Sequence, residues 1–264
     1  MDNQQPSLEQ RKVQRLRYII NKGERILMYD FLNNFSEKDI TYALYGLFLG
    51  DGSYQHGKIR LAHTEKQKFY VKWLEDVFKS YGLEVKSRYD ILKHTTFGES
   101  MYSELYISVP KRFYFETLNK CFDDNNHKII SDYVLNNINE FGLLLWFLDD
   151  GQWHVSFKNN KAKRFGYLNT QSFTYEENQK IVKMFKDRFD IELKIHKDCS
   201  GLDKYKESIY YRLYFNATNF RKFFDVIRPY LQYIPKEFYY KFNMQYTPNR
   251  IRDSLEFSEK YNLI

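Results

Sequence analysis

Two apolar runs that end in acids are the clearest feature of the hydrophobic pattern. One covers residues 42–50 and is followed by Asp51; the other covers residues 141–148 and is followed by Asp149 and Asp150. We interpret each run as an apolar helix, too short to cross a membrane, which must therefore pack on protein. The most economical partner of each helix is the other one. That pairing would bring Asp51 and Asp150 side by side.

The ends of these helices have recognisable signals. Ser36 followed by Asp39 has the spacing of a capping box and predicts the start of the first helix. Either Asn136 or Asn139 could cap the second. The residues expected to stop the two helices are Gly52 and Gly151.

Small residues on the first helix predict close packing. Gly46 and Gly50 lie one helical turn apart, and the matching positions of the second run are Leu145 and Asp149. Helices approach closely where such small residues line one face. We expect large side chains of the second helix to fill the grooves that these glycines leave.

Short alternating segments follow each apolar run. Polar and apolar residues alternate with the period of half-buried strands, and amphipathic helices lie between them. The predicted strands include 58–61, 84–88, 192–196 and 210–216, and the predicted intervening helices are 68–80 and 176–188. The order helix, hairpin, helix, hairpin, helix in each half predicts an α+β fold with one antiparallel sheet per half.

The two halves repeat one another. Leu61 and Leu168 have the same separation along the chain as Phe78 and Phe185, which is typical of a duplicated unit. The acids are closer together by about eight residues, so the second half has an insertion after its acid. We expect this insertion to be a basic loop, because it includes Lys158, Lys161, Lys163 and Arg164.

The repeat divides the chain into four segments: a basic arm (1–37), a first lobe (38–135), a second lobe (136–245) and a tail (246–264). In the arm, Arg11, Lys12, Arg15 and Arg17 have helical spacing. A solvated helix and a DNA contact are equally good interpretations of that arm.

Composition narrows the class of partner. The chain has 264 residues, a net charge of +7 and a pI near 9.0, which favours an anionic partner such as nucleic acid.

Cys121 and Cys199 lack metal-ligand spacing, so a zinc site or disulfide framework is not expected. Without a membrane span or an apolar secretion signal, we expect a soluble intracellular protein, either cytoplasmic or organellar. Paired carboxylates in a basic chain indicate a metal site directed at a polyanion.

Both apolar runs with their acids resemble the LAGLIDADG signature of homing endonucleases. Two copies in one chain resemble the monomeric, two-motif members, and residues 146–151 and 168–177 are especially similar to the mitochondrial omega-intron type. The likeness spans about residues 38–245. It implies a pseudo-twofold pair of lobes whose sheets form a DNA-binding saddle, joined by two packed motif helices.

The resemblance also implies site-specific hydrolysis of both strands of a long asymmetric DNA target, leaving short 3′ overhangs. Asp51 and Asp150 would each supply a carboxylate to Mg²⁺, with Gly50 as a further ligand through its backbone carbonyl. Asp149 would supply either a backbone carbonyl to the metal or a contact between the helices. Mn²⁺ should substitute for Mg²⁺, whereas Ca²⁺ should support binding without cleavage. The family's two catalytic lysines correspond best to Lys128 and Lys241, and Lys236 is a rival for the second.

DNA recognition is expected from the polar faces of the two sheets, because a β-ribbon fits the major groove. The expected DNA-binding residues are Lys58, Arg60, Lys86 and Arg88 in the first half, Lys158, Lys161, Lys163 and Arg164 in the insertion, and Asn169, Gln171, Lys194, His196, Tyr210 and Arg212 in the second half.

Two other functions compete with the endonuclease. An intron maturase would bind intron RNA, and a regulator on the same scaffold would bind DNA without cutting it. A regulator should have lost at least one acid, whereas both are present.

Overall fold

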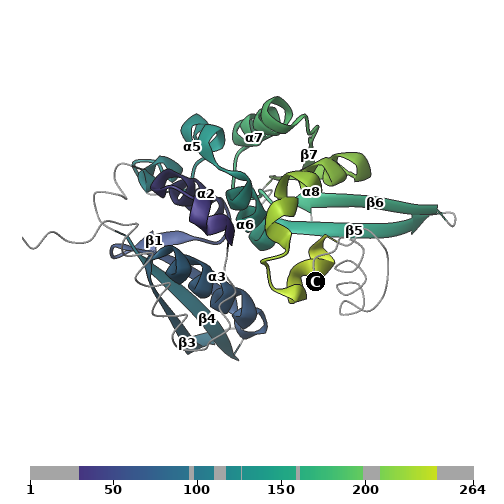
Figure 1. Ribbon diagram of the computed structural model, residues 1–264. Coiled ribbons are helices and arrows are strands. Elements are labelled where there is room, and N and C mark those ends of the chain that lie inside the picture. The colour runs from purple at the N-terminus through teal and green to yellow at the C-terminus, as the bar shows by residue number, and fades with distance from the viewer. Residues whose placement is uncertain are drawn as a thin grey trace, which may run out of the picture. The chain divides into compact units, whose positions relative to one another are not determined.

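The computed structural model describes residues 30–94, 98–109, 117–125, 127–158, 161–198 and 209–242. Within these ranges the fold is α+β, with two four-stranded sheets, each covered by helices (Figure 1). The predicted fold class is confirmed. The basic residues of the arm and the whole of the tail lie outside the described residues. None of the described helices combines the length and apolar character that a membrane crossing requires.

The described residues belong to two compact units. The first contains η1 (Asp30–Asn34) and a sheet of β1 (Ser53–Gln55), β2 (Lys58–Thr64), β3 (Glu84–His94) and β4 (Gly98–Ser108), in the order β1-β2-β4-β3. After the 3-10 turn η2 (Glu65–Gln67), the helix α3 (Lys68–Tyr81) packs on this sheet. Buried Leu74 and Phe78 of α3 share a core with Ile59 and Leu105 of the strands.

The second unit contains α2 (Glu37–Leu49), η3 (Leu118–Cys121), α5 (Asp132–Asn137) and α6 (Glu140–Asp150). Its sheet is formed by β5 (Gly151–Lys158), β6 (Lys161–Leu168), β7 (Lys194–Asp198) and β8 (Tyr210–Asn216), in the order β5-β6-β8-β7. The helices α7 (Tyr175–Phe189) and α8 (Ala217–Leu231) cover this sheet, and η4 (Lys236–Lys241) follows.

Equivalent strands occupy equivalent places in the two sheets. The orders β1-β2-β4-β3 and β5-β6-β8-β7 are the same topology, and a helix separates the two hairpins in both cases. The predicted order of elements is therefore confirmed for the second half and, in the first half, as far as the second hairpin. Residues 110–116, which follow that hairpin, lie outside the described residues. The segment boundaries proposed from the sequence remain a prediction; in the structure α2 belongs to the compact unit that also contains α6.

The predicted basic loop after Asp150 is wrong. Residues 151–168 form the β5–β6 hairpin, in which Lys158 pairs with Lys161 and Val155 with Arg164. The alternation of Trp153, Val155 and Phe157 with polar residues is that of a strand, so the insertion lengthens the hairpin.

The helix starts are as predicted, but one helix end is not. Ser36 and Asp39 form a capping box on α2, and Asn139 caps α6 by accepting from the backbone N–H of Gly142. Gly151 caps the end of α6 as expected. On α2 the cap is Gly50 rather than Gly52, so the first helix ends before its acid.

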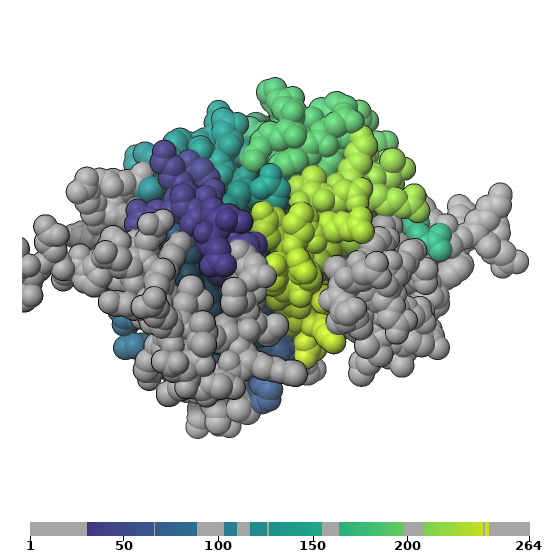
Figure 2. Space-filling model, viewed as in Figure 1, coloured from purple at the N-terminus to yellow at the C-terminus, as the bar shows by residue number. Residues whose placement is uncertain are grey.

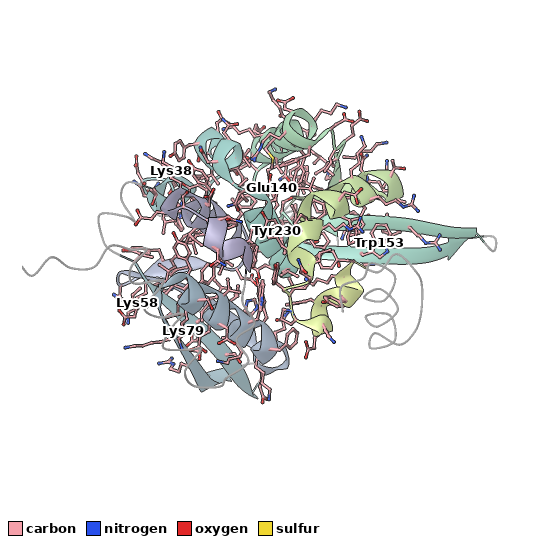
Figure 3. The ribbon with its side chains drawn as sticks, viewed as in Figure 1. Lys38, Lys58, Lys79, Glu140, Trp153 and Tyr230 are labelled. Carbon is pink, nitrogen blue, oxygen red and sulfur yellow. The ribbon has the colours of Figure 1, made fainter. Side chains whose placement is uncertain are left out.

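Helix α8 packs against α6 within the second unit. The rings of Phe141 and Tyr230 have centroids 5.4 Å apart. Tyr230 on α8 and Glu140 on α6 are labelled in Figure 3. The atoms of α2 (purple) and α8 (yellow-green) share the face shown in Figure 2. Burial, followed by the charges of Glu140 and Asp39, raises the pKa of Tyr230 to about 12. Helix α6 is thus enclosed by α2 and α8.

Candidate active site

The helices α2 and α6 meet backbone to backbone. A Cβ atom added at Gly46 would lie 1.9 Å from the carbonyl oxygen of Gly142, and one added at Gly142 would lie 2.7 Å from that of Tyr42. Real Cβ atoms do not approach so closely, so the crossing requires glycine on both helices. The prediction that a large side chain lies opposite Gly46 is wrong, because the nearest atoms are the backbone of Gly142.

Beyond this crossing, Asp149 contacts the end of α2. A Cβ at Gly50 would lie 2.4 Å from Asp149 Oδ2, so Gly50 does face a side chain of the second helix, as expected. The backbone N–H of Asp51 donates to the same oxygen at 3.2 Å. The backbone N–H of Gly52 instead bonds Leu47 O at 2.7 Å. The chain therefore leaves the helix at Gly50 and presents Asp51 as an exposed residue.

Asp150 has a different setting, as the last residue of α6. Its carbonyl oxygen accepts from the backbone N–H of Asn169 at 3.0 Å. Burial raises the pKa of its carboxyl to about 7, the charge of Asp51 adds to this, and Lys128 and Lys241 oppose it. The two acids at the ends of the paired helices are therefore close enough to interact electrostatically.

Lys128 reaches the end of α2 from a small hairpin. Phe122 and Lys128 form an antiparallel bridge, and Asp123 Oδ1 closes the turn by accepting from the backbone N–H groups of Asn125 and His127. The ammonium of Lys128 donates to Gly50 O. Burial lowers the pKa of Lys128, against the charges of Asp150, Asp51 and Asp149.

Lys241 has the corresponding place at the end of α6. Its ammonium donates to Leu148 O at 2.6 Å and lies 3.5 Å from Asp149 O. The residue is 8% exposed, and burial lowers its pKa to about 8, against the charges of Asp149, Asp150 and Asp51. Lys236, at the other end of η4, is exposed. The structure thus brings Lys241 to the acids.

Each lysine binds a carbonyl just before an acid. Gly50 O precedes Asp51, and Asp149 O precedes Asp150. Ammonium groups are favourable at helix C-termini, where carbonyl groups lack helical partners. The result is one cluster of three carboxylates, two ammonium groups and backbone carbonyls at the ends of two helices. Such a cluster can hold a hard cation and offer cationic donors to a phosphate.

The first sheet presents most of its predicted DNA-binding residues on the face opposite α3. Lys58, Lys86 and Arg88 help to line a groove of about 570 Å³, together with Gln55, His56, Ser87 and Tyr106. Arg60 is held by Glu104, a buried acid of β4 that the sequence reasoning missed. The available signal was an acid at a polar position of an alternating segment, Glu104 before Leu105, Tyr106 and Ile107.

The second sheet gathers aromatic rings on the face opposite its helices. His196 and Tyr214 stack with centroids 4.5 Å apart, and the Arg212 guanidinium lies 3.9 Å from the centre of the Tyr167 ring. The predicted residues Lys194, His196, Tyr210 and Arg212 lie in β7 and β8, and Arg164 lies in β6.

Two predicted DNA-binding residues are not on a strand. Strand β6 ends at Leu168, and Asn169 and Gln171 lie in the turn before α7. Gln152 Nε2 donates to Asn169 Oδ1 at 3.2 Å, so Asn169 bridges β5 and the end of α6. The side chains of Lys158, Lys161 and Lys163 lie outside the described part of the structure.

Comparisons with known proteins bear on this arrangement. The model of the LAGLIDADG DNA endonuclease family matches residues 41–223. A probable intron-encoded endonuclease 1 of Wickerhamomyces canadensis is 31% identical over 162 residues, covering 58% of this chain and 65% of the relative. A probable intron-encoded DNA endonuclease 3 of Mycosarcoma maydis is 28% identical over 103 residues, covering 39% of this chain and 65% of the relative. The chain thus spans slightly less than two thirds of the length of both curated relatives.

A solved structure agrees in fold. The homing endonuclease I-WcaI, bound to its DNA recognition sequence, matches with a TM-score of 0.63 and 22% identity, over 85% of this chain and 95% of that one. The family model spans both apolar motif helices and both sheets, which is more than half of the chain. The chain therefore belongs to the LAGLIDADG DNA endonuclease family.

Proposed function

We propose that the chain is a site-specific endonuclease that hydrolyses both strands of duplex DNA with the help of a divalent metal. The observation that carries the proposal is the convergence of Asp51, Asp150, Lys128 and Lys241 at the ends of two packed helices. Each half of the repeat contributes one acid and one lysine, as cutting two strands requires. Because both acids belong to one chain, the protein would act as a monomer. It would act inside the cell, in the cytoplasm or an organelle.

The donors suit Mg²⁺. Hard cations of this size take carboxylate and carbonyl oxygens, which Asp51, Asp150, Gly50 and Asp149 can supply. Burial and the charge of Asp51 make ionisation of Asp150 unfavourable, so a cation would stabilise the ionised form. When bound, Mg²⁺ would activate water and neutralise charge on the phosphate, with Mn²⁺ as a substitute and Ca²⁺ supporting binding alone.

The lysines have a role beside the cation. Lys128 and Lys241 bond carbonyls adjacent to the acids, so each ammonium can turn from its carbonyl to a phosphate oxygen. There it would stabilise the negative charge that develops as the phosphodiester bond breaks. Cuts at two such sites on opposite strands would leave short 3′ overhangs.

A second candidate is RNA binding, as in an intron maturase. The observation in its favour is the ring cluster on the second sheet, where His154, Phe165, Tyr167 and Tyr214 are near neighbours. Aromatic side chains on a sheet surface are a common platform for unpaired bases. A non-catalytic DNA regulator would have no use for the cluster of acids and lysines at the helix ends.

The test is selection from a library of randomised DNA duplexes incubated with the protein and Mg²⁺. The proposal expects one long, asymmetric sequence to be cut in both strands, and EDTA to stop cutting. Absence of any cut sequence with Mg²⁺ or Mn²⁺, together with tight binding of RNA hairpins, would replace the proposal with the maturase function.

A further inference from the structure

Glu104 occupies the centre of the polar face of the first sheet. On β4 it pairs with Ala62 of β2 on one side and with Arg88 of β3 on the other. Its neighbours Leu105 and Ser103 are buried on the face that α3 covers, so Glu104 points to the opposite face. Even there it is only 2% exposed, because side chains of the adjacent strands cover it.

The covering groups are two arginines and a tyrosine. Arg60 Nε donates to Glu104 Oε1 at 2.9 Å, and its Nη2 bonds the same oxygen. Arg88 Nε and Nη2 lie 3.1 Å and 2.9 Å from Glu104 Oε2. The hydroxyl of Tyr106 donates to Oε2 at 2.9 Å. Although burial alone would raise the pKa of Glu104, the hydrogen bonds from Arg60 and Tyr106 lower it, so the group is a carboxylate.

The way in which the arginines bind Glu104 fixes their direction. Both use Nε and Nη2, which form one side of the guanidinium plane. The end of the plane, Nη1 with Nη2, is a pair of donors that matches O6 and N7 of guanine in the major groove. A carboxylate bound to the side edge therefore fixes the orientation of the guanidinium. It also fixes the direction in which the donors at the end of the guanidinium point.

The second sheet has the opposite charge at this position. Tyr106 pairs with Arg60 and Lys86, and Tyr214 pairs with Tyr167 and Lys194, so Tyr106 and Tyr214 are equivalent. The residues two places earlier are therefore equivalent as well, and these are Glu104 and Arg212. Where Glu104 is flanked by arginines, Arg212 is flanked by Tyr167 and His196.

We infer that Glu104 is a positioning residue for base recognition, which orients Arg60 and Arg88 to read guanine edges and withdraws their charge from phosphate binding. The inference rests on the proposed function and specifies how one half of the target is read. With Arg212 in place of Glu104, the second sheet would read its half-site with other side chains.

The lysines of the same face have the complementary task. The side chain of Lys86 is 72% exposed, and Lys58 is also an exposed residue of the groove. Exposed ammonium groups without a buried carboxylate partner bind phosphate as point charges. Lysines on this sheet should therefore set affinity, and the arginines held by Glu104 should set specificity.

The experiment uses the full chain and the sequence that it selects from the randomised duplex library. Glu104→Gln keeps the shape but removes the charge, and Arg60→Lys and Arg88→Lys keep the charge but lose the planar fork. Each variant should lose about tenfold in discrimination at guanine positions of one half-site. Glu104→Gln should also steepen the salt dependence of binding to unrelated duplex by about one unit. Arg60→Lys and Arg88→Lys should leave the salt dependence unchanged.

The matched control is Asp76→Asn on α3, the covered side of the sheet, where Asp76 pairs with Lys72 in an exposed ion pair. It removes the same charge and should leave discrimination at the wild-type level. If a thermal melt shows that Glu104→Gln is not folded, Arg60→Lys and Arg88→Lys provide the test. Unchanged discrimination in the folded variants, with wild-type protein cutting its target, would overturn this inference alone. Failure of the wild-type protein to cut any duplex would overturn the proposed function as well.

Discussion

The carboxylate of Asp149 accepts a hydrogen bond from the backbone N–H of Asp51, 3.2 Å away. Asp51 N–H would otherwise continue the helical hydrogen bonding of α2, but Gly52 N–H takes the carbonyl of Leu47 in its place. An acid of the second motif helix therefore shapes the backbone that carries the acid of the first.

The first prediction concerns Asp149. Asp149→Asn retains an oxygen that can accept from Asp51 N–H, whereas Asp149→Ala does not. We expect Asp149→Ala to reduce the rate of cleavage by about tenfold or more, because small displacements of reacting groups are costly. Asp149→Asn should be milder than either Asp51→Asn or Asp150→Asn. Single-turnover cleavage of the selected duplex measures both, and equal rates for the Ala and Asn variants would show that the hydrogen bond is unimportant.

The second prediction concerns the glycine at the helix crossing. Replacing Gly46 with Leu places a side chain where the backbone of Gly142 lies, so the helices must separate. The cost should be roughly 1–3 kcal/mol or more, and cleavage should fall in the protein that still folds. Lys38→Leu, at the exposed start of the same helix, is the control. Thermal unfolding of Gly46→Leu at the wild-type temperature, with wild-type cleavage, would be incompatible with the packing described.

The third prediction concerns pH and the metal-free protein. The pKa of Asp150 rises to about 7 in the fold, from an ordinary value of about 4. Between these two pH values the folded state binds more protons at Asp150 than the unfolded state does. The contribution of Asp150 to stability is therefore fully present below pH 4 and is lost as pH rises to about 7. Asp150→Asn should lack this decline.

In EDTA, Asp150→Asn should therefore melt above the wild-type protein at pH 8, by about 3 °C or more, and the difference should shrink towards pH 4. Asp187→Asn, in an exposed ion pair with Lys183, is the control and should show no such trend. A difference between Asp150→Asn and wild type that is the same at pH 4 and pH 8 would contradict the assignment of the raised pKa to Asp150.

The fourth prediction concerns salt. Lys58 and Lys194 are exposed on the polar faces of their sheets. Replacing either with Ala should reduce the slope of log affinity against log salt by about one unit for each lost phosphate contact. Lys183→Ala on α7 should leave the slope unchanged. Equal affinity for RNA hairpins and duplex DNA would instead favour the maturase function.

Local patterns were sufficient to predict much of the fold. The capping box at Ser36 and the strand Tyr210–Asn216 depend on short-range signals and were correctly predicted. For the second motif helix the sequence left Asn136 and Asn139 open, and Asn139 is the cap. The early end of α2 depends on Asp149, which comes from a distant part of the chain, so local signals misplaced it. The cover over Glu104 likewise depends on strand pairing, which periodicity does not specify.

The central claim is that Asp51 and Asp150 form one catalytic cluster with a divalent metal. The direct measurement compares binding in Ca²⁺ with cleavage in Mg²⁺ for Asp51→Asn and Asp150→Asn on the selected duplex. We expect both variants to bind at close to wild-type affinity and neither to produce a double-strand break, because the amide retains the size of the carboxylate but loses its affinity for the metal. Wild-type rates of double-strand cleavage in both variants would contradict the account.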